Sequence, residues 1–234
     1  MPITENASIQ RYEPGGLARI DDTLVTELNV AIQLHSKELI RATCSPGHLH
    51  EWVIGYLLSE GYIAKPGDVA EIEEADGVFG VRLSDLAPTE PREAARLESE
   101  LIVEPQRVLD IARGVVSQAD VFHRTGGTHA MAIATEHEVF AFAEDISRTC
   151  ALEKALGIAL LEGAEFGQCV AFLSSRVPSR MLIKLARCGI PIVAAVSAPT
   201  ADAVRIAERL NVCLCGFVRD EKMNVYAHGW RLGL

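Results

Sequence analysis

The chain has 234 residues, of which 49% are hydrophobic, and a formal net charge of −10. This composition supplies enough apolar side chains for one large domain or two modest ones. The negative charge, without any run dense in Lys and Arg, argues against nucleic acid as the main partner, because backbone binding needs a basic face. No apolar run approaches the roughly 18 residues of a membrane span, and the first residues lack the regions of a signal peptide. We therefore expect a cytoplasmic protein with no membrane partner.

The first third of the chain has the patterns of short paired strands around one helix. Strands are expected within residues 1–45. A helix is expected from Ser45 to Gly61, because apolar residues recur there at helical spacing and glycine is a usual helix end. Two hairpins complete this region, and their paired strands are Val30–Leu34 with Leu39–Thr43 and Val69–Glu74 with Val78–Leu83.

A polar stretch separates this region from the rest of the chain. Residues Ser84 to Pro105 include three prolines, a composition typical of a linker or mobile loop. A short amphipathic helix is predicted from Pro105 to Val116. We place a domain boundary at this point, which gives an N-terminal domain over residues 1–105 and a second domain over residues 106–234.

A glycine-rich segment opens the second domain. Gly126 and Gly127 lie within Thr125–His129, and two glycines let the backbone turn sharply and approach a ligand closely. A hairpin formed by residues 130–134 and 138–143 is expected to follow. The sequence therefore indicates a turn that a strand pair holds in place.

Charged residues gather at the start of the next predicted helix, which ends at Gly163. Glu144, Asp145 and Arg148 either cap this helix as a solvated ion pair or belong to a site, and the sequence favours neither interpretation. Cys150 lies in the first turn, where the helix dipole would lower the pKa of a thiol. Cys150 is therefore the candidate reactive thiol.

The six cysteines show neither a disulfide framework nor a CxxC pair. A metal or persulfide role is only weakly indicated for Cys213 and Cys215, which share one strand face. Four cysteines are expected to be buried, unreactive thiols, namely Cys169, Cys188, Cys213 and Cys215. We predict no metal site.

Three apolar runs in the last third of the chain each end in small or polar residues, after which a helical pattern begins. These runs cover residues 169–173, 190–196 and 212–218. Strands that alternate with helices predict parallel pairing, with the carboxyl ends of the strands at one sheet edge. Ligands bind along that edge in open α/β sheets. Five polar residues there either bind phosphate or only cap helices, and they are Ser174, Ser175, Arg176, Ser197 and Thr200.

Several motifs, in one order along the chain, resemble the FdhD/NarQ family. They include Thr125-Gly-Gly-Thr-His-Ala130, Glu144-Asp-Ile-Ser-Arg148, Ser197-Ala-Pro-Thr200 and Gly216-Phe-Val-Arg219 to Asn224-Val-Tyr226. The resemblance covers most of the chain. It implies a cytidine-deaminase-like, three-layer α/β/α domain with a smaller N-terminal α+β domain, in agreement with the α/β sheet expected from the apolar runs.

The resemblance also implies a function. Members of this family are described as sulfurtransferases that take persulfide sulfur from a cysteine desulfurase. They pass it to the molybdenum or tungsten bis-guanine-dinucleotide cofactor that formate dehydrogenase needs, and they tend to form homodimers. In this sequence the implied cofactor-binding segment is Phe217, Val218, Arg219, Asp220, Glu221 and Lys222, and the edge and glycine motifs add Arg176, Ser197, Thr200, Gly126, Gly127 and His129.

One departure from the family pattern concerns the sulfur-carrying cysteine. The family carries a CxxC on a loop before the Thr-Gly-Gly motif, but the corresponding residues 81–118 contain no cysteine. The family's Gly-Arg-His-Asn also appears here as Ser147-Arg148-Thr149-Cys150. A cofactor-binding chaperone without sulfur transfer is therefore an alternative, and a relocated thiol such as Cys150 is another. A nucleotide deaminase would need a zinc-binding spacing that the sequence lacks.

Overall fold

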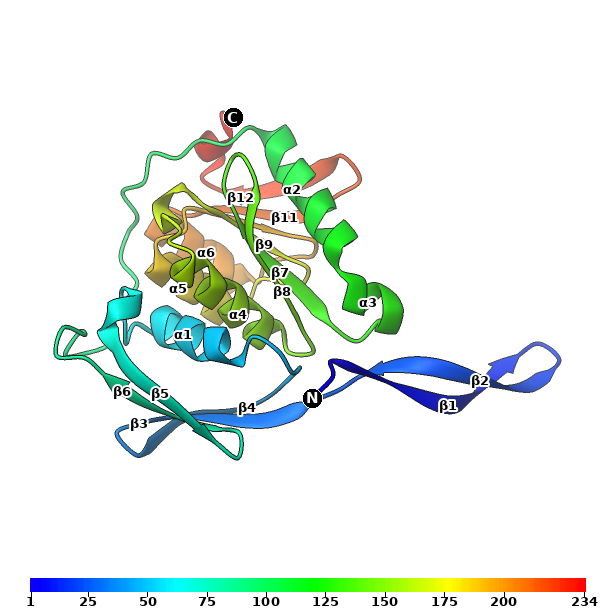
Figure 1. Cartoon of the computed structure of the whole chain (residues 1–234). Coiled ribbons are helices and arrows are strands. Elements are labelled where there is room, and N and C mark those ends of the chain that lie inside the picture. Colours follow the sequence, from blue (N-terminus) through cyan, green and yellow to red (C-terminus); the bar gives the residue numbers. More distant parts are fainter.

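The computed structural model describes residues 1–234, and its largest sheet has six strands in the order β12-β11-β10-β9-β7-β8 (Figure 1). The three apolar runs form neighbouring parallel strands, as predicted. The α/β class is therefore confirmed, while the likeness to cytidine deaminases stays a prediction. The strands are β7 (His129–Ala134), β8 (Val139–Asp145), β9 (Val170–Leu173), β10 (Ile192–Ala195), β11 (Cys213–Arg219) and β12 (Lys222–Ala227).

The end of β11 differs from the prediction. A helical pattern was expected after the third apolar run, but the chain turns back at Asp220 and Glu221 into the antiparallel strand β12. Both turn residues have positive φ, of 51° and 60°, which is the backbone of a two-residue hairpin whose twist matches its strands. The polar residues after β11 therefore form a hairpin turn at the edge of the sheet.

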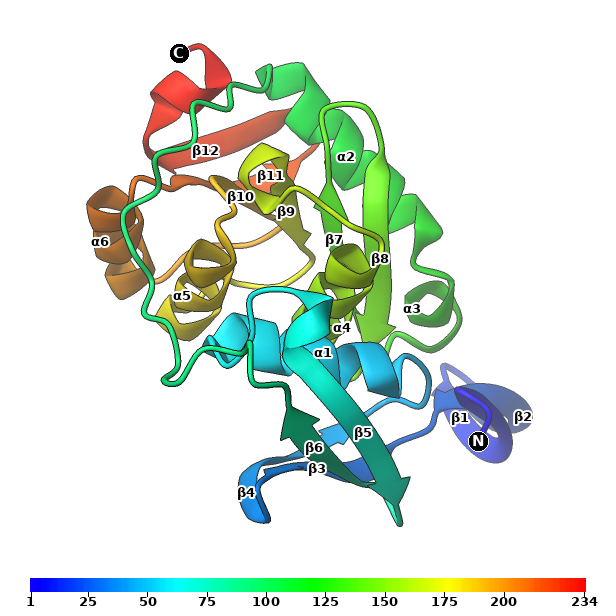
Figure 2. The same ribbon diagram turned by 60° about the vertical axis from the view of Figure 1, so that its left-hand side comes forward.

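Helices cover both faces of this sheet, so the domain has three layers (Figure 2). Alternate residues of β7 show the two sides, since Met131 and Ile133 belong to the core under α4 while Ala130 and Ala132 belong to the core under α2. One face carries α4 (Arg148–Leu161), α5 (Ser179–Cys188) and α6 (Ala201–Leu210), and the other carries α2 (Pro105–Gln118), which is followed by α3 (Asp120–Thr125).

The helix α1 (Leu49–Glu60) packs directly on α4 as an additional layer. Two glycines make this contact possible, because a Cβ atom on Gly55 would overlap the Glu153 carbonyl oxygen, and one on Gly157 would overlap the Glu51 carbonyl oxygen. The two backbones are therefore closer than any larger side chain would allow. The sequence predicted helix α1, but it did not predict that α1 packs against α4.

The remaining strands form two smaller sheets. The four-stranded sheet has the order β4-β3-β6-β5 and contains both predicted hairpins, joined by a parallel pair between β3 and β6. A long two-stranded arm extends from the body (Figure 1). Their bounds are β1 (Thr4–Glu13) and β2 (Gly16–Val25) in the arm, and β3 (Leu28–Leu34), β4 (Lys37–Cys44), β5 (Val69–Ala75) and β6 (Val78–Leu83) in the sheet.

The polar stretch before α2 contains no helix or strand, but hydrogen bonds connect it to the body. The amide of Arg92 donates to the Gly61 carbonyl at 3.0 Å, and the amide of Leu97 donates to the Leu210 carbonyl at 3.0 Å. Val103 is fully buried. Backbone hydrogen bonds therefore fasten this segment along the body at these points, and the linker or mobile loop stays a prediction.

The larger hydrophobic core contains residues from both sides of residue 105, including Trp52 and Leu152. The division into residues 1–105 and 106–234 stays a prediction. Three short 3₁₀ helices complete the chain, at Pro66–Asp68, Phe166–Gln168 and Gly229–Leu232. Every helix is too short or too polar to span a bilayer.

Candidate functional site

Two adjoining cavities lie where the carboxyl ends of β9, β10 and β11 face α2 and α3. Their volumes are about 380 and 580 Å³, and both are lined by Val116 and Val196. We call them together the edge groove. Its other lining residues are Leu109, Ala112, Arg113, Ser117, Ala119, Phe122, His123, Gly126–Ala130, Ser174 and Val218–Glu221.

One wall of the edge groove is the glycine-rich segment before β7. The Glu144 carboxylate accepts hydrogen bonds from the amides of Val121 and Phe122, at 3.0 and 2.8 Å, and from the Thr128 hydroxyl at 2.9 Å. Gly126 ends α3 with a φ of 66°, a conformation that favours glycine. Glu144 thus anchors α3 and the glycine-rich segment to β8, and it settles their shape rather than lining the groove.

The second of the two cavities is lined by the hairpin between β11 and β12, whose backbone is strained. Phe217 has a φ of 53° at an irregularity in the strand pairing, close to the turn residues with positive φ. Each non-glycine residue in this region costs about 1–3 kcal/mol, and such strain is common at ligand sites. The Arg113 guanidinium on α2 contacts the Glu221 carboxylate and holds the turn against the helix.

Seven of the predicted cofactor-binding residues line the edge groove. The Arg219 guanidinium carbon lies 5.9 Å from the centre of the Phe217 ring, close enough for a cation–π contact on an exposed surface. The seven lining residues are Gly126, Gly127, His129, Val218, Arg219, Asp220 and Glu221.

The other five predicted residues do not line the groove. The Thr200 hydroxyl accepts a hydrogen bond from the Ala203 amide at 3.2 Å, so this side chain caps α6. The Ser197 carbonyl accepts a 3.4 Å hydrogen bond from the Phe217 amide, which places Ser197 beside the irregularity in the pairing of β11 and β12. Arg176 and Lys222 are exposed, and Phe217 is half-buried.

Sequence reasoning did not find the helical wall of the groove. Val116 and Arg113 lie on α2, and Phe122 lies on α3. The amphipathic pattern of α2 indicated a buried face, but nothing local indicated that its rim would meet the ends of the strands. Val116 is exposed at the end of that helix, which the sequence alone does not record.

His129 has an environment that favours the neutral imidazole. Burial lowers its pKa first, the Arg148 cation lowers it further, and the Asp145 carboxylate opposes both effects. A neutral ring can donate one hydrogen bond and accept another. His129 therefore offers the groove a polar group without a charge.

A separate cavity, of about 450 Å³, lies between α1, α4, α5 and β4, away from the edge groove. We call it the thiol pocket, because Cys150 lines it. Charged residues on its walls are Glu60, Arg148, Glu153, Arg180 and Lys184, and the uncharged residues are Ile40, Ala42, Tyr56, Ser147, Thr149, Cys150, Pro178, Ser179 and Met181.

The structure corrects the prediction for the pKa of Cys150. The side chain is only 3% exposed. A hydrogen bond with the Cys44 thiol, followed by burial, raises the pKa of Cys150 instead of lowering it. The same hydrogen bond lowers the pKa of Cys44, with support from the Lys154 ammonium and against the effect of burial.

The other cysteines lie elsewhere in the fold. Cys169, Cys213 and Cys215 are buried, as predicted, and the sulfur atoms of the last two lie 3.9 Å apart. Cys188 is half-buried where burial was predicted, and burial raises its pKa to about 12.

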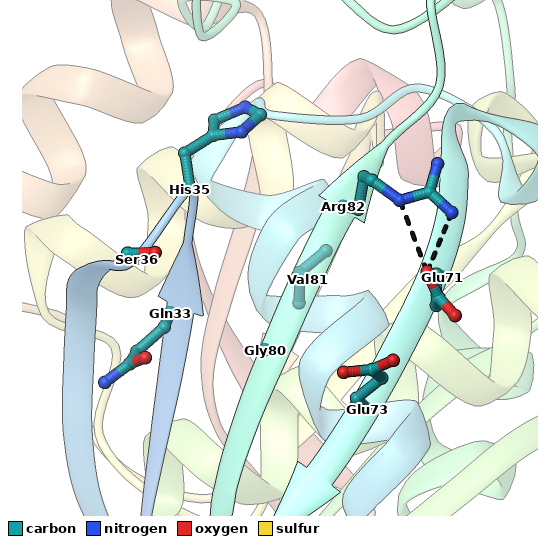
Figure 3. A pocket seen from close by; sticks show the side chains of 8 residues that line it. All are labelled: Gln33, His35, Ser36, Glu71, Glu73, Gly80, Val81 and Arg82. Atoms are coloured by element: carbon teal, nitrogen blue, oxygen red, sulfur yellow. Dashed lines mark hydrogen bonds and ion pairs between the residues drawn. The ribbon is translucent and has the colours of Figure 1, made fainter.

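A third hollow lies on the outer face of the four-stranded sheet and has a different character. Figure 3 shows polar side chains from β3, β5 and β6 around it, and among them the Arg82 guanidinium donates to the Glu71 carboxylate at 2.7 Å. Both side chains are largely exposed, and such pairs contribute little to stability. This surface therefore supplies control positions away from the edge groove.

The fold and the edge groove define an α/β protein with a groove at the carboxyl edge of its central sheet, where proteins of this class bind ligands. The chain belongs to the FdhD/NarQ family, whose model matches residues 25–101 and 81–233. The two matched parts meet in residues 81–101, within the stretch where the family resemblance leads us to expect the missing CxxC.

Relatives of known sequence agree with this assignment. The sulfur carrier protein FdhD of Staphylococcus haemolyticus is 31% identical over 256 aligned positions, which cover 98% of this chain and 97% of the relative. The protein of the same name from Methanothermobacter thermautotrophicus is 31% identical over 92% of this chain and 93% of its own length. The first alignment is longer than this chain, so that relative contains residues that are missing here.

A solved structure confirms the fold. A candidate formate dehydrogenase accessory protein from Desulfotalea psychrophila superposes with a TM-score of 0.86 at 24% identity. The match covers 99% of this chain and 100% of that one. The arm, the four-stranded sheet and the three-layer domain therefore form one architecture that both proteins share.

Proposed function

We propose that the protein is a formate dehydrogenase accessory protein that binds a molybdenum or tungsten bis-guanine-dinucleotide cofactor in the edge groove. It assists the sulfuration and delivery of this cofactor, which is its cargo. The observation that carries the proposal is that the glycine-rich segment and the Val218–Glu221 segment line two adjoining cavities, which share Val116 and Val196. Membership of a family whose relatives are named sulfur carrier proteins supports it.

The chemistry of the groove suits a guanine nucleotide. The guanine edge has N–H donors, and the Asp220 carboxylate is an exposed acceptor at the rim. Val116, Phe122 and Val196 supply apolar surface for the base. Arg219 supplies a guanidinium for phosphate, which it can bind through two hydrogen bonds.

Gly126 leaves room for a phosphate to approach the backbone. A Cβ atom on this residue would have no heavy atom within 4 Å, so the space beside it is open. The adjacent Gly127 has less room, because a Cβ atom there would press on the Val25 side chain. Gly126 therefore faces open space in the groove, while Gly127 lets β2 pack closely.

Formate dehydrogenase is the partner that receives the cofactor, and the protein acts in the cytoplasm as a homodimer. A cysteine desulfurase supplies the sulfur. The absence of a CxxC favours an alternative, in which the protein holds and delivers the cofactor without transferring sulfur itself. These two forms of the proposal share the edge groove and differ only in the role of cysteine.

Formate dehydrogenase activity in a bacterial strain without its own FdhD tests the proposal. The wild-type chain should restore activity, and Arg219→Ala should restore much less, because phosphate binding is lost. Arg82→Ala is the matched control, since Arg82 is an exposed arginine on the four-stranded sheet, and it should restore activity fully. Equal activity with both variants would contradict the role of the groove.

A further inference from the structure

The larger cavity of the edge groove has positive and negative side chains in equal number. Arg113 on α2 and Arg219 on β11 both line this cavity of about 580 Å³, and so do the turn residues Asp220 and Glu221. The charges of these four side chains sum to zero. A ligand with several phosphate groups therefore gains from the two guanidinium groups only where a carboxylate does not already neutralise them.

The Arg113 guanidinium is shared between two carboxylates. Its Nη1 atom donates to Glu221 in the hairpin turn, and its Nη2 atom donates to Asp110, three residues earlier on α2. The Gln106 side-chain amide donates to the same Asp110 oxygen at 3.1 Å. Glu221 lines the cavity and Asp110 does not. Asp110 therefore fixes Arg113 to its own helix, while Glu221 occupies it as a group of the cavity lining.

The contact between Arg113 and Glu221 is one that a phosphate can replace. Both side chains are more than half exposed, and ion pairs of this kind contribute little to stability. A phosphate group carries more charge than a carboxylate and can accept two parallel hydrogen bonds from one guanidinium. Exchange of the Glu221 carboxylate for a phosphate is therefore favourable for Arg113.

We propose that Arg113 is a second phosphate-binding residue of the edge groove, and that Glu221 blocks it until a ligand with a diphosphate group takes its place. This inference rests on the proposed function, because a guanine dinucleotide supplies the diphosphate. Arg219 binds one phosphate and Arg113 the other. Asp110 keeps its contact during the exchange, so the guanidinium stays in position when Glu221 moves away.

Glu221 then determines which ligands the groove accepts. A nucleoside without phosphate leaves the contact between Arg113 and Glu221 intact. A monophosphate can bind Arg219 alone, whereas a diphosphate also reaches Arg113 and displaces the carboxylate. A competing charge of this kind gives specificity by disfavouring the wrong ligand. The groove should therefore bind GDP more tightly than GMP, and Arg113 should supply that difference.

Calorimetric titration of Glu221→Gln tests the blocking contact. This variant should bind GDP about fivefold more tightly than the wild type, the factor by which an exposed ion pair can oppose binding. Binding of guanosine, which has no phosphate, should not change. Glu71→Gln is the matched control, since it frees the exposed Arg82 on the four-stranded sheet and should bind GDP like the wild type. Unchanged or weaker GDP binding by Glu221→Gln would overturn the proposal.

Arg113→Ala tests the second phosphate contact. It should bind GDP about tenfold more weakly than the wild type, because a charged hydrogen bond to phosphate is lost, and it should bind GMP as the wild type does. In the Arg113→Ala background, Glu221→Gln should no longer tighten GDP binding. Removal of any negative charge would instead tighten it in both backgrounds, so an equal gain with and without Arg113 would overturn the proposal.

Titration of the same variants with inorganic pyrophosphate separates this inference from the proposed function. Equal GDP binding by the wild type and Arg113→Ala would leave the guanine site in place and overturn the role of Arg113. Pyrophosphate binding that weakens in Arg113→Ala and tightens in Glu221→Gln, without any GDP binding, would support Arg113 and contradict the guanine site. Absence of binding of both ligands to the wild type would overturn both.

Discussion

The contact between α1 and α4 and the edge groove use polar residues in opposite ways. Where α4 meets the end of β8 and the residues that lead into α1, the Lys154 and Asp145 side chains are buried and paired, and Lys154 donates to the Ser45 carbonyl. In the edge groove, Arg219 and Asp220 are exposed and belong to a strained hairpin. Removing one partner of a buried ion pair lowers stability strongly, because the other charge stays buried and unpaired. Exposed charged groups, by contrast, are available to a ligand.

This difference predicts whether a substitution changes the stability of the fold or the binding of a ligand. A change in the helical contact removes interactions that the fold itself needs, so it should reduce the free energy of unfolding. A change in the groove removes little from the fold, so it should reduce ligand binding. Four variants probe this division, and they are ordered from the largest expected effect to the smallest.

Lys154→Ala should have the largest effect on stability. It leaves the buried Asp145 carboxylate without its cation, which costs about 3–5 kcal/mol in the free energy of unfolding. Urea denaturation measures the loss. Arg82→Ala breaks the exposed pair with Glu71 and should cost about 0–1 kcal/mol. Equal losses in the two variants would show that the buried pair has no special role.

Gly157→Ala should follow, because the new methyl group would meet the Glu51 carbonyl oxygen and force α1 away from α4. Overpacking of this kind costs about 1–3 kcal/mol, and a backbone neighbour places it toward the upper end. Gly114→Ala in α2 is the matched control, since no heavy atom lies within 4 Å of the new Cβ. That control should gain about 0.5–1 kcal/mol from helix propensity. Unchanged stability in Gly157→Ala would contradict the close helix contact.

Thr200→Ala decides between the two interpretations of the sheet edge. The hydroxyl caps α6, so its loss should cost about 1 kcal/mol in the free energy of unfolding. GDP binding should stay unchanged, because Thr200 does not line the groove. A loss of binding at unchanged stability would instead make Thr200 a ligand residue.

His129→Gln should have the smallest effect, visible only in acid. Burial and the Arg148 cation lower the pKa of His129, so the unfolded chain takes up a proton that the folded chain resists. Wild-type stability should therefore fall as the pH decreases below about 6.5, the usual histidine value, and through the lowered pKa. His129→Gln should lose less stability over that range. His137 is exposed, so His137→Gln should lose as much stability in acid as the wild type does. An equal loss of stability in His129→Gln and His137→Gln would exclude His129 as the cause.

Local patterns predicted most of the elements. The apolar runs that became β9, β10 and β11 were continuous and ended in turn residues, so their type and parallel pairing followed from sequence. Contacts between residues far apart in the sequence were the main feature that could not be predicted. The segment around Leu97 is fastened by a carbonyl group far away in sequence, at Leu210, and no local pattern records such a bond.

The candidate site was predicted in part for the same reason. Motif resemblance found Arg219 and the glycine-rich segment, because these residues are contiguous in sequence. It could not show that the Thr200 hydroxyl caps α6, or that Cys150 would be buried and its pKa raised. The helix dipole suggested a lowered thiol pKa, but a buried thiol neighbour outweighs that effect.

Calorimetric titration with GDP tests the central claim most directly, namely that the edge groove binds a guanine nucleotide. The wild-type chain and Arg82→Ala should bind GDP with the same affinity. Arg219→Ala should bind at least tenfold more weakly, which corresponds to about 1.4 kcal/mol, because a charged hydrogen bond to phosphate is lost. Absence of GDP binding in the wild type, or equal binding by Arg219→Ala and Arg82→Ala, would contradict the account.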